Sequence, residues 1–221
     1  MDPLLKKKTK HGLLIAAVLF LLMAGSSAYL FTRVQALAGE VKVLNAQSGE
    51  MNRYVRLSEK YTAMSRLFWG DRAGDCGVPV IKMVDRAVKQ YGDSVVTADM
   101  ALSVIAVESG FRGDIVSYAG AVGYMGVMPS TARQYLPVNQ KDLMDPYINI
   151  SCGVRYLAFL LRKYHRQGLD PFPYALEAYN RGPGKFDHEL ADRNAVSYLN
   201  GYSRKVSYAM FSSISERINE H

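Results

Sequence analysis

The stretch from Thr97 to Gly110, TADMALSVIAVESG, combines a helix start, an apolar run and a helix stop. Threonine is a favoured N-cap residue, and the apolar residues that follow Thr97 recur on adjoining helical turns. Glu108 comes at the end of this run, directly before Ser109 and Gly110. The pattern predicts a helix that ends near Gly110 and carries one carboxylate in its last turn.

The position of Glu108 has a chemical consequence. The unsatisfied carbonyls of a helix C-terminus and the apolar neighbours both disfavour a negative charge, so we expect the pKa of Glu108 to be raised. A carboxylic acid that keeps its proton near neutral pH is suited to general-acid cleavage of a glycosidic bond. The competing interpretation is an ordinary solvated charge at a helix end.

From residue 76 onward the pattern is helical with short connections. No alternating run indicates a large sheet, and no internal repeat is visible. Asp145-Pro146 reads as a cap followed by a first-turn proline, which begins a long amphipathic run to Gly168. The sequence predicts a mainly α domain with helices over residues 79–90, 98–109, 146–167, 170–180 and 202–218.

Composition and charge limit the function classes. The 221 residues are 49% hydrophobic, enough for one core with an appendage. The net charge of +7 is mostly N-terminal, because residues 1–75 hold 11 Lys/Arg against 6 Asp/Glu and residues 76–221 hold 16 against 14. No arginine-rich stripe or cluster of stacking aromatics is present, so we expect no nucleic-acid partner.

The N-terminus predicts a membrane anchor. An uncharged apolar segment from Gly12 to Thr32 has 21 residues and is long enough to span a bilayer as a helix. Four basic residues precede this segment, and only Arg33 lies close to its far end. This asymmetry of charge predicts a cytoplasmic N-terminus, with the rest of the chain exported to the periplasm. The basic residues before the segment are Lys6, Lys7, Lys8 and Lys10.

A cleavable signal peptide is the alternative. Its apolar core would be Leu13 to Met23, and Ser26-Ser27-Ala28 would be a small-residue cleavage site. We favour an uncleaved anchor over residues 1–33, because Tyr29-Leu30-Phe31 continues the apolar run. Both interpretations export the rest of the chain.

A helical linker is predicted over residues 34–75. Its apolar residues fall near a heptad rhythm that is interrupted at Ser48 and Gly49. The segment could pair with a second copy, although we favour a plain amphipathic linker. Because residues 70–75, GDRAGD, show no periodicity, we place the boundary of the domain 76–221 there. The heptad residues are Val34, Leu37, Val41, Leu44, Met51 and Val55.

Cysteines and histidines give weaker indications. In an oxidising compartment Cys76 and Cys152 could form a disulfide, and two buried unpaired thiols are the alternative. The histidines are scattered without metal-ligand spacing, so we expect neither a metal nor another cofactor. They are His11, His165, His188 and His221.

Several ordered motifs follow Glu108. Residues 108–111 read ESGF, and residues 117–133 read SYAGAVGYMGVMPSTAR. Residues 149–157 then read NISCGVRYL, residues 178–184 read AYNRGPG, and residues 202–206 read YSRKV. Over about residues 95–210 the chain resembles the lytic transglycosylase family related to goose-type lysozyme.

The resemblance implies a lysozyme-like all-α fold and a groove for the glycan strand of peptidoglycan. It implies Glu108 as the sole catalytic acid and base, which protonates the bridging oxygen and then takes the proton of the C6 hydroxyl as a 1,6-anhydro ring closes. Because the nucleophile is tethered to the sugar, no second carboxylate is needed. Asp114, Glu177 and Asp187 are expected to be surface or capping groups.

The resemblance also implies substrate-binding residues. Ser109 would bond Glu108 or a sugar hydroxyl, or only close the helix end, and Tyr202 would bond Glu108. Tyr124 and Met125 would line the groove, with core packing as the alternative. The full set is Ser109, Ser117, Gly123, Tyr124, Met125, Tyr179, Asn180 and Tyr202, with Tyr179 and Asn180 facing the cleft.

One position departs from the family. Where the family usually has Gly-Leu-Met-Gln, this chain has Gly123-Tyr124-Met125-Gly126, so an amide side chain is missing. Weaker binding at that subsite, or compensation by Tyr124, is expected.

The function expected from these observations is an inner-membrane-anchored lytic transglycosylase. It would open the wall locally for a secretion, conjugation or phage entry apparatus. The alternatives are a hydrolytic lysozyme and a catalytically silent peptidoglycan-binding scaffold.

Overall fold

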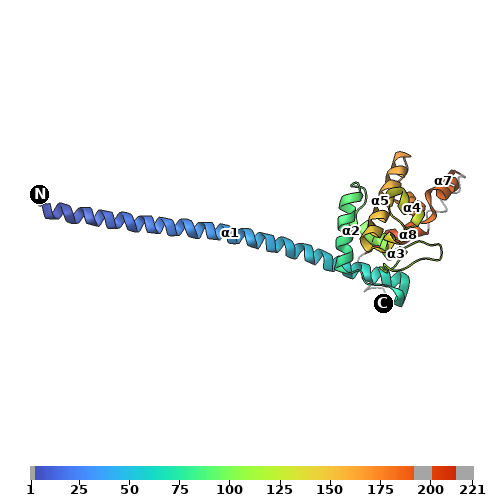
Figure 1. Cartoon of the computed structure of the whole chain (residues 1–221), viewed down its shortest axis with the longest axis horizontal. Coiled ribbons are helices and arrows are strands. Elements are labelled where there is room, and N and C mark those ends of the chain that lie inside the picture. The colour runs from blue at the N-terminus through green and yellow to red at the C-terminus, as the bar shows by residue number, and fades with distance from the viewer. Residues whose placement is uncertain (1–2, 192–200, 213–221) are drawn as a thin grey trace. The chain divides into compact units, whose positions relative to one another are not determined.

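The protein is all-α, as the sequence predicts (Figure 1). The structure is a computed structural model that describes residues 3–191 and 201–212, with side chains from residue 23 onward. Apart from two isolated bridges, Val116 with Val122 and Val122 with Val127, this part of the chain contains no β-structure. The helices are α1 (Pro3–Trp69), α2 (Val78–Tyr91), α3 (Ala98–Glu108), α4 (Pro129–Tyr135), α5 (Pro146–Arg166), α6 (Pro171–Arg181), α7 (Pro183–Ala191) and α8 (Tyr202–Phe211), with 3-10 turns η1 (Gly70–Arg72) and η2 (Asp142–Met144).

Helix α3 is buried on all sides. Six consecutive residues, Ala101 to Ala106, are buried, and the helix packs against α2 and α8. Thr97 caps it as predicted, because its Oγ1 accepts a hydrogen bond from the Met100 amide at 3.2 Å. The helix ends at Glu108, so its length and its position in the core agree with the apolar run of the sequence.

Helix α5 is the other main core helix and packs against α2, α4 and α6. The Asp145 carboxylate caps it by accepting from the Ile148 amide at 2.8 Å, which confirms the predicted start. Helix α8 begins at Tyr202 as predicted and ends at Phe211; residues 213–221, which were included in the predicted helix, lie outside the described residues. The short helices α4 and α7 were not predicted.

The last part of α1 belongs to the globular unit. Contacts divide the chain into residues 1–52 and residues 53–221. The second unit therefore begins at Arg53, earlier than the predicted boundary at residues 70–75, because Tyr54, Tyr61 and Met64 point into the core. Arg53 also makes two hydrogen bonds to Asp85 of α2, at 2.7 and 3.1 Å.

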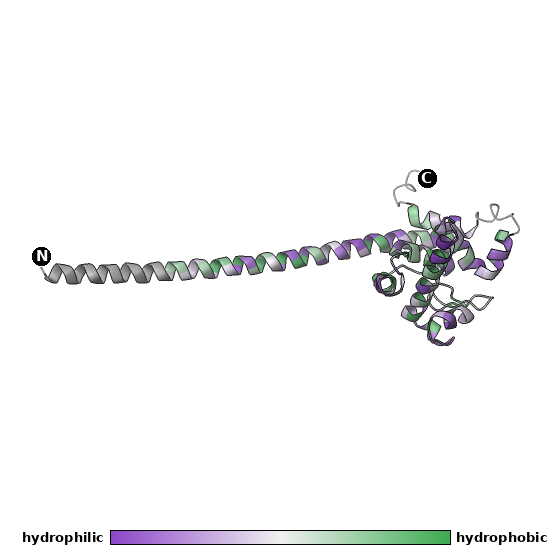
Figure 2. Ribbon diagram, turned by 90° about the horizontal axis from the view of Figure 1, so that it is seen from above, coloured by the Kyte–Doolittle hydropathy of each residue, from purple (hydrophilic) through white to green (hydrophobic). Residues whose placement is uncertain are grey.

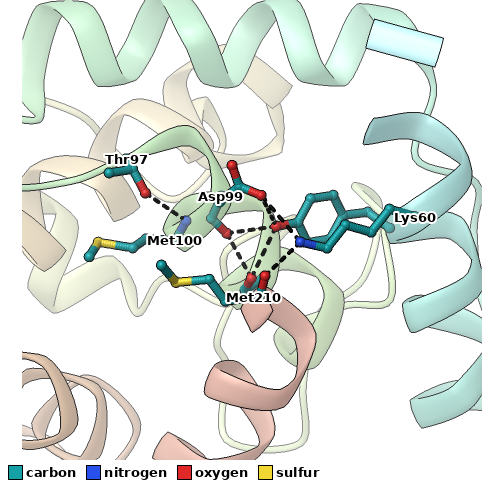
Figure 3. Close-up of polar contacts among 7 residues, drawn as sticks. Lys60, Thr97, Asp99, Met100 and Met210 are labelled. Carbon is teal, nitrogen blue, oxygen red and sulfur yellow. Dashed lines mark hydrogen bonds and ion pairs between the residues drawn. The ribbon is translucent and has the colours of Figure 1, made fainter. Parts of the chain in front are cut away.

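A polar junction ties α1 to two other helices (Figure 3). Lys60 Nζ donates to the Met210 carbonyl of α8 at 2.6 Å and to Asp99 Oδ1 of α3 at 3.3 Å. The Tyr61 hydroxyl donates to the same Asp99 oxygen at 2.7 Å. The last turns of α8 and the first turn of α3 are thus held by α1.

The N-terminal unit consists of the first part of α1. The helix continues through Ser48 and Gly49, because one glycine costs a helix only about 1 kcal/mol. Much of the expected membrane segment from Gly12 to Thr32 falls on residues whose side chains lie outside the described part. Within the described residues, no helix combines the length and the apolar character that a membrane crossing requires.

Cys76 and Cys152 are both buried free thiols. Of the two arrangements that the sequence left open, the unpaired one is present, and no disulfide joins these residues. Burial raises the pKa of the Cys76 thiol to about 12, so this residue behaves as a small core side chain.

We expect Met64→Ala to lower the free energy of unfolding by about 2–5 kcal/mol, because it leaves a cavity in the core beneath α1. The matched control on the same helix is Leu67→Ala, at a side chain that is 53% exposed, which should change stability by less than about 0.5 kcal/mol. Urea unfolding of the full chain measures both. Equal effects would contradict the assignment of residues 53–69 to the domain.

Candidate active site

Glu108 is the last residue of α3 and is half-buried. Burial raises the pKa of its carboxyl from the usual 4.5 to about 7, and the nearby Tyr202 hydroxyl acts in the opposite direction. The direction of the shift agrees with the sequence prediction. Its largest cause is loss of solvent around the charged form. Near neutral pH, Glu108 can therefore both give and take a proton.

The end of α3 is braced by residues of α1. Trp69 Nε1 donates to the Ala106 carbonyl at 3.0 Å, and Ser65 Oγ donates to the Gly110 carbonyl at 2.9 Å. The Ala106 carbonyl is one of those that a helix end leaves without an intrahelical partner, and Gly110 lies just after the end of α3. Hydrogen bonds from α1 thereby hold the backbone on both sides of Glu108 in place.

Ser109 closes the end of α3, which is one of the roles expected for it. Its side chain is fully buried, and its Oγ donates to the Ile105 carbonyl at 3.2 Å. The prediction that it contacts a sugar is corrected here, because a fully buried hydroxyl that is already bonded to the backbone closes the helix end and is closed to a ligand.

The loop from Val122 to Val127 is held by two buried side chains. Asn149 Oδ1 accepts from the Met125 amide at 2.9 Å, and its Nδ2 donates to the Val122 carbonyl at 2.8 Å. The Tyr179 hydroxyl donates to the Met125 carbonyl at 2.8 Å. Gly123 has φ +72°, and a Cβ there would lie 2.4 Å from Asn149 Nδ2, so the turn requires glycine.

Gly126 brings this loop against the acid. Its φ is +58°, and a Cβ built on it would lie 2.6 Å from Glu108 Oε2. Gly126 stands at the position where the family usually has glutamine. In this chain its backbone passes directly beside the carboxyl group of Glu108. A side chain on that backbone would occupy space that Glu108 now fills.

A cleft of about 180 Å³ begins at Gly126. Tyr179 lines it, together with the exposed Asn180 from the end of α6. Of the described residues that line the cleft, none is acidic, and Arg181 is basic. The lining consists of Gly126, Val127, Met128, Thr131, Tyr156, Tyr179, Asn180, Arg181 and Gly182.

Tyr202 lies at the start of α8 and faces Glu108. Its hydroxyl is buried without a hydrogen-bond partner, so the two side chains are close without the geometry of a hydrogen bond. Burial, and next the nearby Glu108 charge, hold the pKa of Tyr202 well above its usual value. This hydroxyl remains protonated and is available as a donor to the ionised acid.

Three other predicted residues lie elsewhere. Met125 is fully buried and packs against Gly153, so its side chain is core and the groove prediction is corrected, because the loop turns it inward. Tyr124 is half-buried and lines a separate open hollow of about 390 Å³. Ser117 is exposed, and its Oγ accepts from the Ala121 amide at 3.0 Å within the same loop.

The other carboxylates have structural partners or lie in solvent. Glu177 was expected at the surface or as a cap. It is fully buried, and its Oε1 accepts from the Ser203 amide at 2.9 Å, so it caps α8. Asp187 accepts from the Tyr164 hydroxyl at 2.8 Å, and Asp114 is exposed.

Some site residues were missed from the sequence. Asn149 lies in a quoted motif, and a polar residue within the apolar run of α5 was the signal of a buried hydrogen-bonding role. Tyr156, Thr131 and Arg181 also line the cleft. Each lies in a quoted motif, and nothing in the local sequence distinguishes it there from a packing or surface residue.

Comparison with known protein families shows which family this chain belongs to. The family model described as the transglycosylase SLT domain matches residues 85–200, just over half of the chain. The chain belongs to the transglycosylase SLT family. The resemblance identified from the motifs is thereby confirmed.

The curated relatives of this family are similar to this chain over only part of their own length. The membrane-bound lytic murein transglycosylase C of Haemophilus ducreyi is 34% identical over 142 residues, which cover 59% of this chain and 38% of that protein. The protein of the same name from Actinobacillus pleuropneumoniae serotype 5b is 33% identical over 143 residues, covering 58% and 38%. The matched part of the SLT chain thus covers well under half the length of these relatives.

Two solved structures are similar to this chain at lower sequence identity. The 70 kDa soluble lytic transglycosylase of Escherichia coli has 23% identity and a TM-score of 0.46, over 57% of this chain and 22% of that one. The lytic transglycosylase Slt of Pseudomonas aeruginosa has 24% identity and a TM-score of 0.47, over 58% and 22%.

The raised pKa of Glu108 predicts how stability depends on pH. Because the folded state holds this proton more tightly, its contribution to stability is fully present below about pH 4.5 and is lost as pH rises through about 7. Glu108→Gln removes the titration, so this SLT variant should gain stability relative to the natural chain as pH rises from 4.5 to 8. Urea unfolding across that range measures the difference, with the exposed Glu59→Gln as control. A difference independent of pH would contradict the shift.

Proposed function

We propose that the chain is a peptidoglycan lytic transglycosylase that uses Glu108 as its single acid and base. The observation that carries the proposal is a half-buried carboxyl with a pKa of about 7, next to Gly126 of a cleft whose described lining holds no acidic residue. Membership of the SLT family supports it, as do relatives named lytic murein transglycosylases.

In the proposed reaction, Glu108 donates its proton to the oxygen between N-acetylmuramic acid and N-acetylglucosamine. The bond from that oxygen to C1 breaks, and the C6 hydroxyl oxygen of the same muramic acid attacks C1. The C6 proton passes to Glu108, which restores the acid and closes a 1,6-anhydro ring. Water is neither consumed nor released.

A single carboxyl group suffices for this route. Hydrolytic glycosidases with two carboxylates use the second one to activate water or to attack the sugar. Here the nucleophile is already attached to the substrate, which raises its effective concentration, and the acetamido group can support the positive charge at C1. While Glu108 is ionised, the nearby Tyr202 hydroxyl, which has no other hydrogen-bond partner, can turn to donate to it.

The cleft offers groups suited to a sugar. Asn180 can donate to and accept from an acetamido group, and the aromatic rings of Tyr156 and Tyr179 lie 5.1 Å apart along one wall. We assign Tyr124 and the exposed Ser117 to more distant parts of the same glycan strand. Because Gly126 has no side chain, contact at that subsite comes from the backbone.

We further propose that the enzyme is held at the inner membrane by residues 1–33 and acts in the periplasm. The basic residues before an apolar segment and the relatives named membrane-bound support this placement. An anchored enzyme of this kind is suited to opening the wall locally for a secretion, conjugation or phage entry complex.

The deciding experiment digests isolated sacculi with the natural chain and with Glu108→Gln. We expect the variant to lose activity by about 100- to 10,000-fold while it still binds, because it lacks the general acid. Mass spectrometry of the products should show anhydro-muropeptides. Products heavier by one water would identify a lysozyme instead, and binding without cleavage by either chain would identify a scaffold.

Gly126→Ala tests how closely the loop must approach the acid. The new Cβ displaces the Glu108 carboxyl, so we expect about 10- to 100-fold lower activity on sacculi. Gly120→Ala is the matched control, because Gly120 also has a positive φ, +88°, but has open space around it. Both variants should lose about 1–2 kcal/mol of stability from the left-handed backbone. Similar activities for the two would show that the contact with Glu108 is unimportant.

A further inference from the structure

Helix α1 carries two successive apolar stripes. The later stripe consists of side chains spaced three and four residues apart that face the core of the domain. Tyr61 and Met64 are fully buried, and the others are at least partly buried. The domain itself therefore covers this stripe, which consists of Tyr54, Leu57, Tyr61, Met64 and Phe68.

The earlier stripe is exposed in the structure. Its positions alternate in steps of four and three, which is the heptad spacing of a coiled coil. The exposed fraction of its apolar side chains runs from 43% at Val55 to 62% at Val34 and Leu44. The stripe consists of Leu30, Val34, Leu37, Val41, Leu44, Ser48, Met51 and Val55.

The two stripes occupy different faces of one helix. Tyr54 ends up in the core and Val55 in solvent, and adjacent helical residues point about 100° apart. Packing of the domain on residues 54–68 therefore leaves Val55, the last residue of the earlier stripe, exposed. Figure 2 shows the apolar and polar residues interleaved along this part of the helix.

We propose that residues 34–55 pair with the same segment of a second copy of this chain as a parallel two-stranded coiled coil. The choice of residues supports this occupant. Valine recurs at the a positions, Val34, Val41 and Val55, and the d positions hold Leu37, Leu44 and Met51. β-branched residues at a with leucine at d favour two parallel strands.

The remaining positions of the heptad allow two identical helices to approach. Ser48 takes one a position, and a polar a residue fixes the register of such pairs. The e positions Ala38, Asn45 and Asn52 carry no charge, so Glu40 at a g position meets no like charge on the partner. Met51 and Val55, which follow Ser48, keep the d and a positions of the same heptad frame, and α1 continues through this region without a break. The dimer would carry two domains on one stem.

Cysteine cross-linking of the full chain in detergent micelles tests the proposal. Leu44→Cys places a thiol in the seam, and Ala46→Cys, at an f position, places one on the opposite side of the same helix turn. Because a disulfide needs closely spaced Cβ atoms, we expect Leu44→Cys to form covalent dimers under mild oxidation about tenfold faster. The unaltered chain controls for the buried native thiols. Equal rates at the two positions would overturn the proposal.

Mass measurement provides the second readout. Sedimentation equilibrium should give two copies for the natural chain and one for the double variant Leu37→Lys, Leu44→Lys, while Ala46→Lys stays dimeric. All of these chains keep residues 1–33, so association through the anchor would survive the lysines and overturn the proposal. A natural chain with the mass of one, three or four copies would overturn it as well.

Discussion

Partial burial of the Glu108 carboxyl is the constraint on which the site depends. An acid in contact with bulk water would be ionised at neutral pH and could not protonate a leaving group. Helix α3 prevents this, because six consecutive buried residues hold it inside the domain and Glu108 is its last residue. The carboxyl therefore lies at the edge of the core, next to Gly126, which lines the cleft, and burial raises its pKa to about 7.

Holding an acid in that place requires support from several directions. Trp69 and Ser65 of α1 bind the carbonyls at the end of α3, and Asn149 of α5 binds the loop that carries Gly126. Buried backbone groups need such hydrogen-bond partners, and the Gly110 carbonyl has a second one in the Gly74 amide, at 2.7 Å. The same contacts that stabilise the fold thus set the position of the proton donor. The last part of α1 therefore supports the site directly, through Ser65 and Trp69.

The sequence by itself determined the local structure and the family. The caps Thr97 and Asp145, the apolar run before Glu108 and the amphipathic run of α5 predict helices that the structure contains. These signals are local, because a cap and a helical face are formed by residues within a few positions of one another. The order of the motifs identified the family, and the position of Glu108 at a helix end predicted the direction of its pKa shift.

Only the tertiary structure decided which motif residues meet at the acid. Met125 and Tyr124 are neighbours in sequence, yet one packs in the core and the other lines a separate hollow, because the loop turns at Gly123. The contact of Gly126 with Glu108 and the burial of residues after Arg53 likewise join segments that are distant along the chain. No local pattern encodes such contacts, since they depend on how separate helices pack, and that packing also sets how much water reaches the carboxyl.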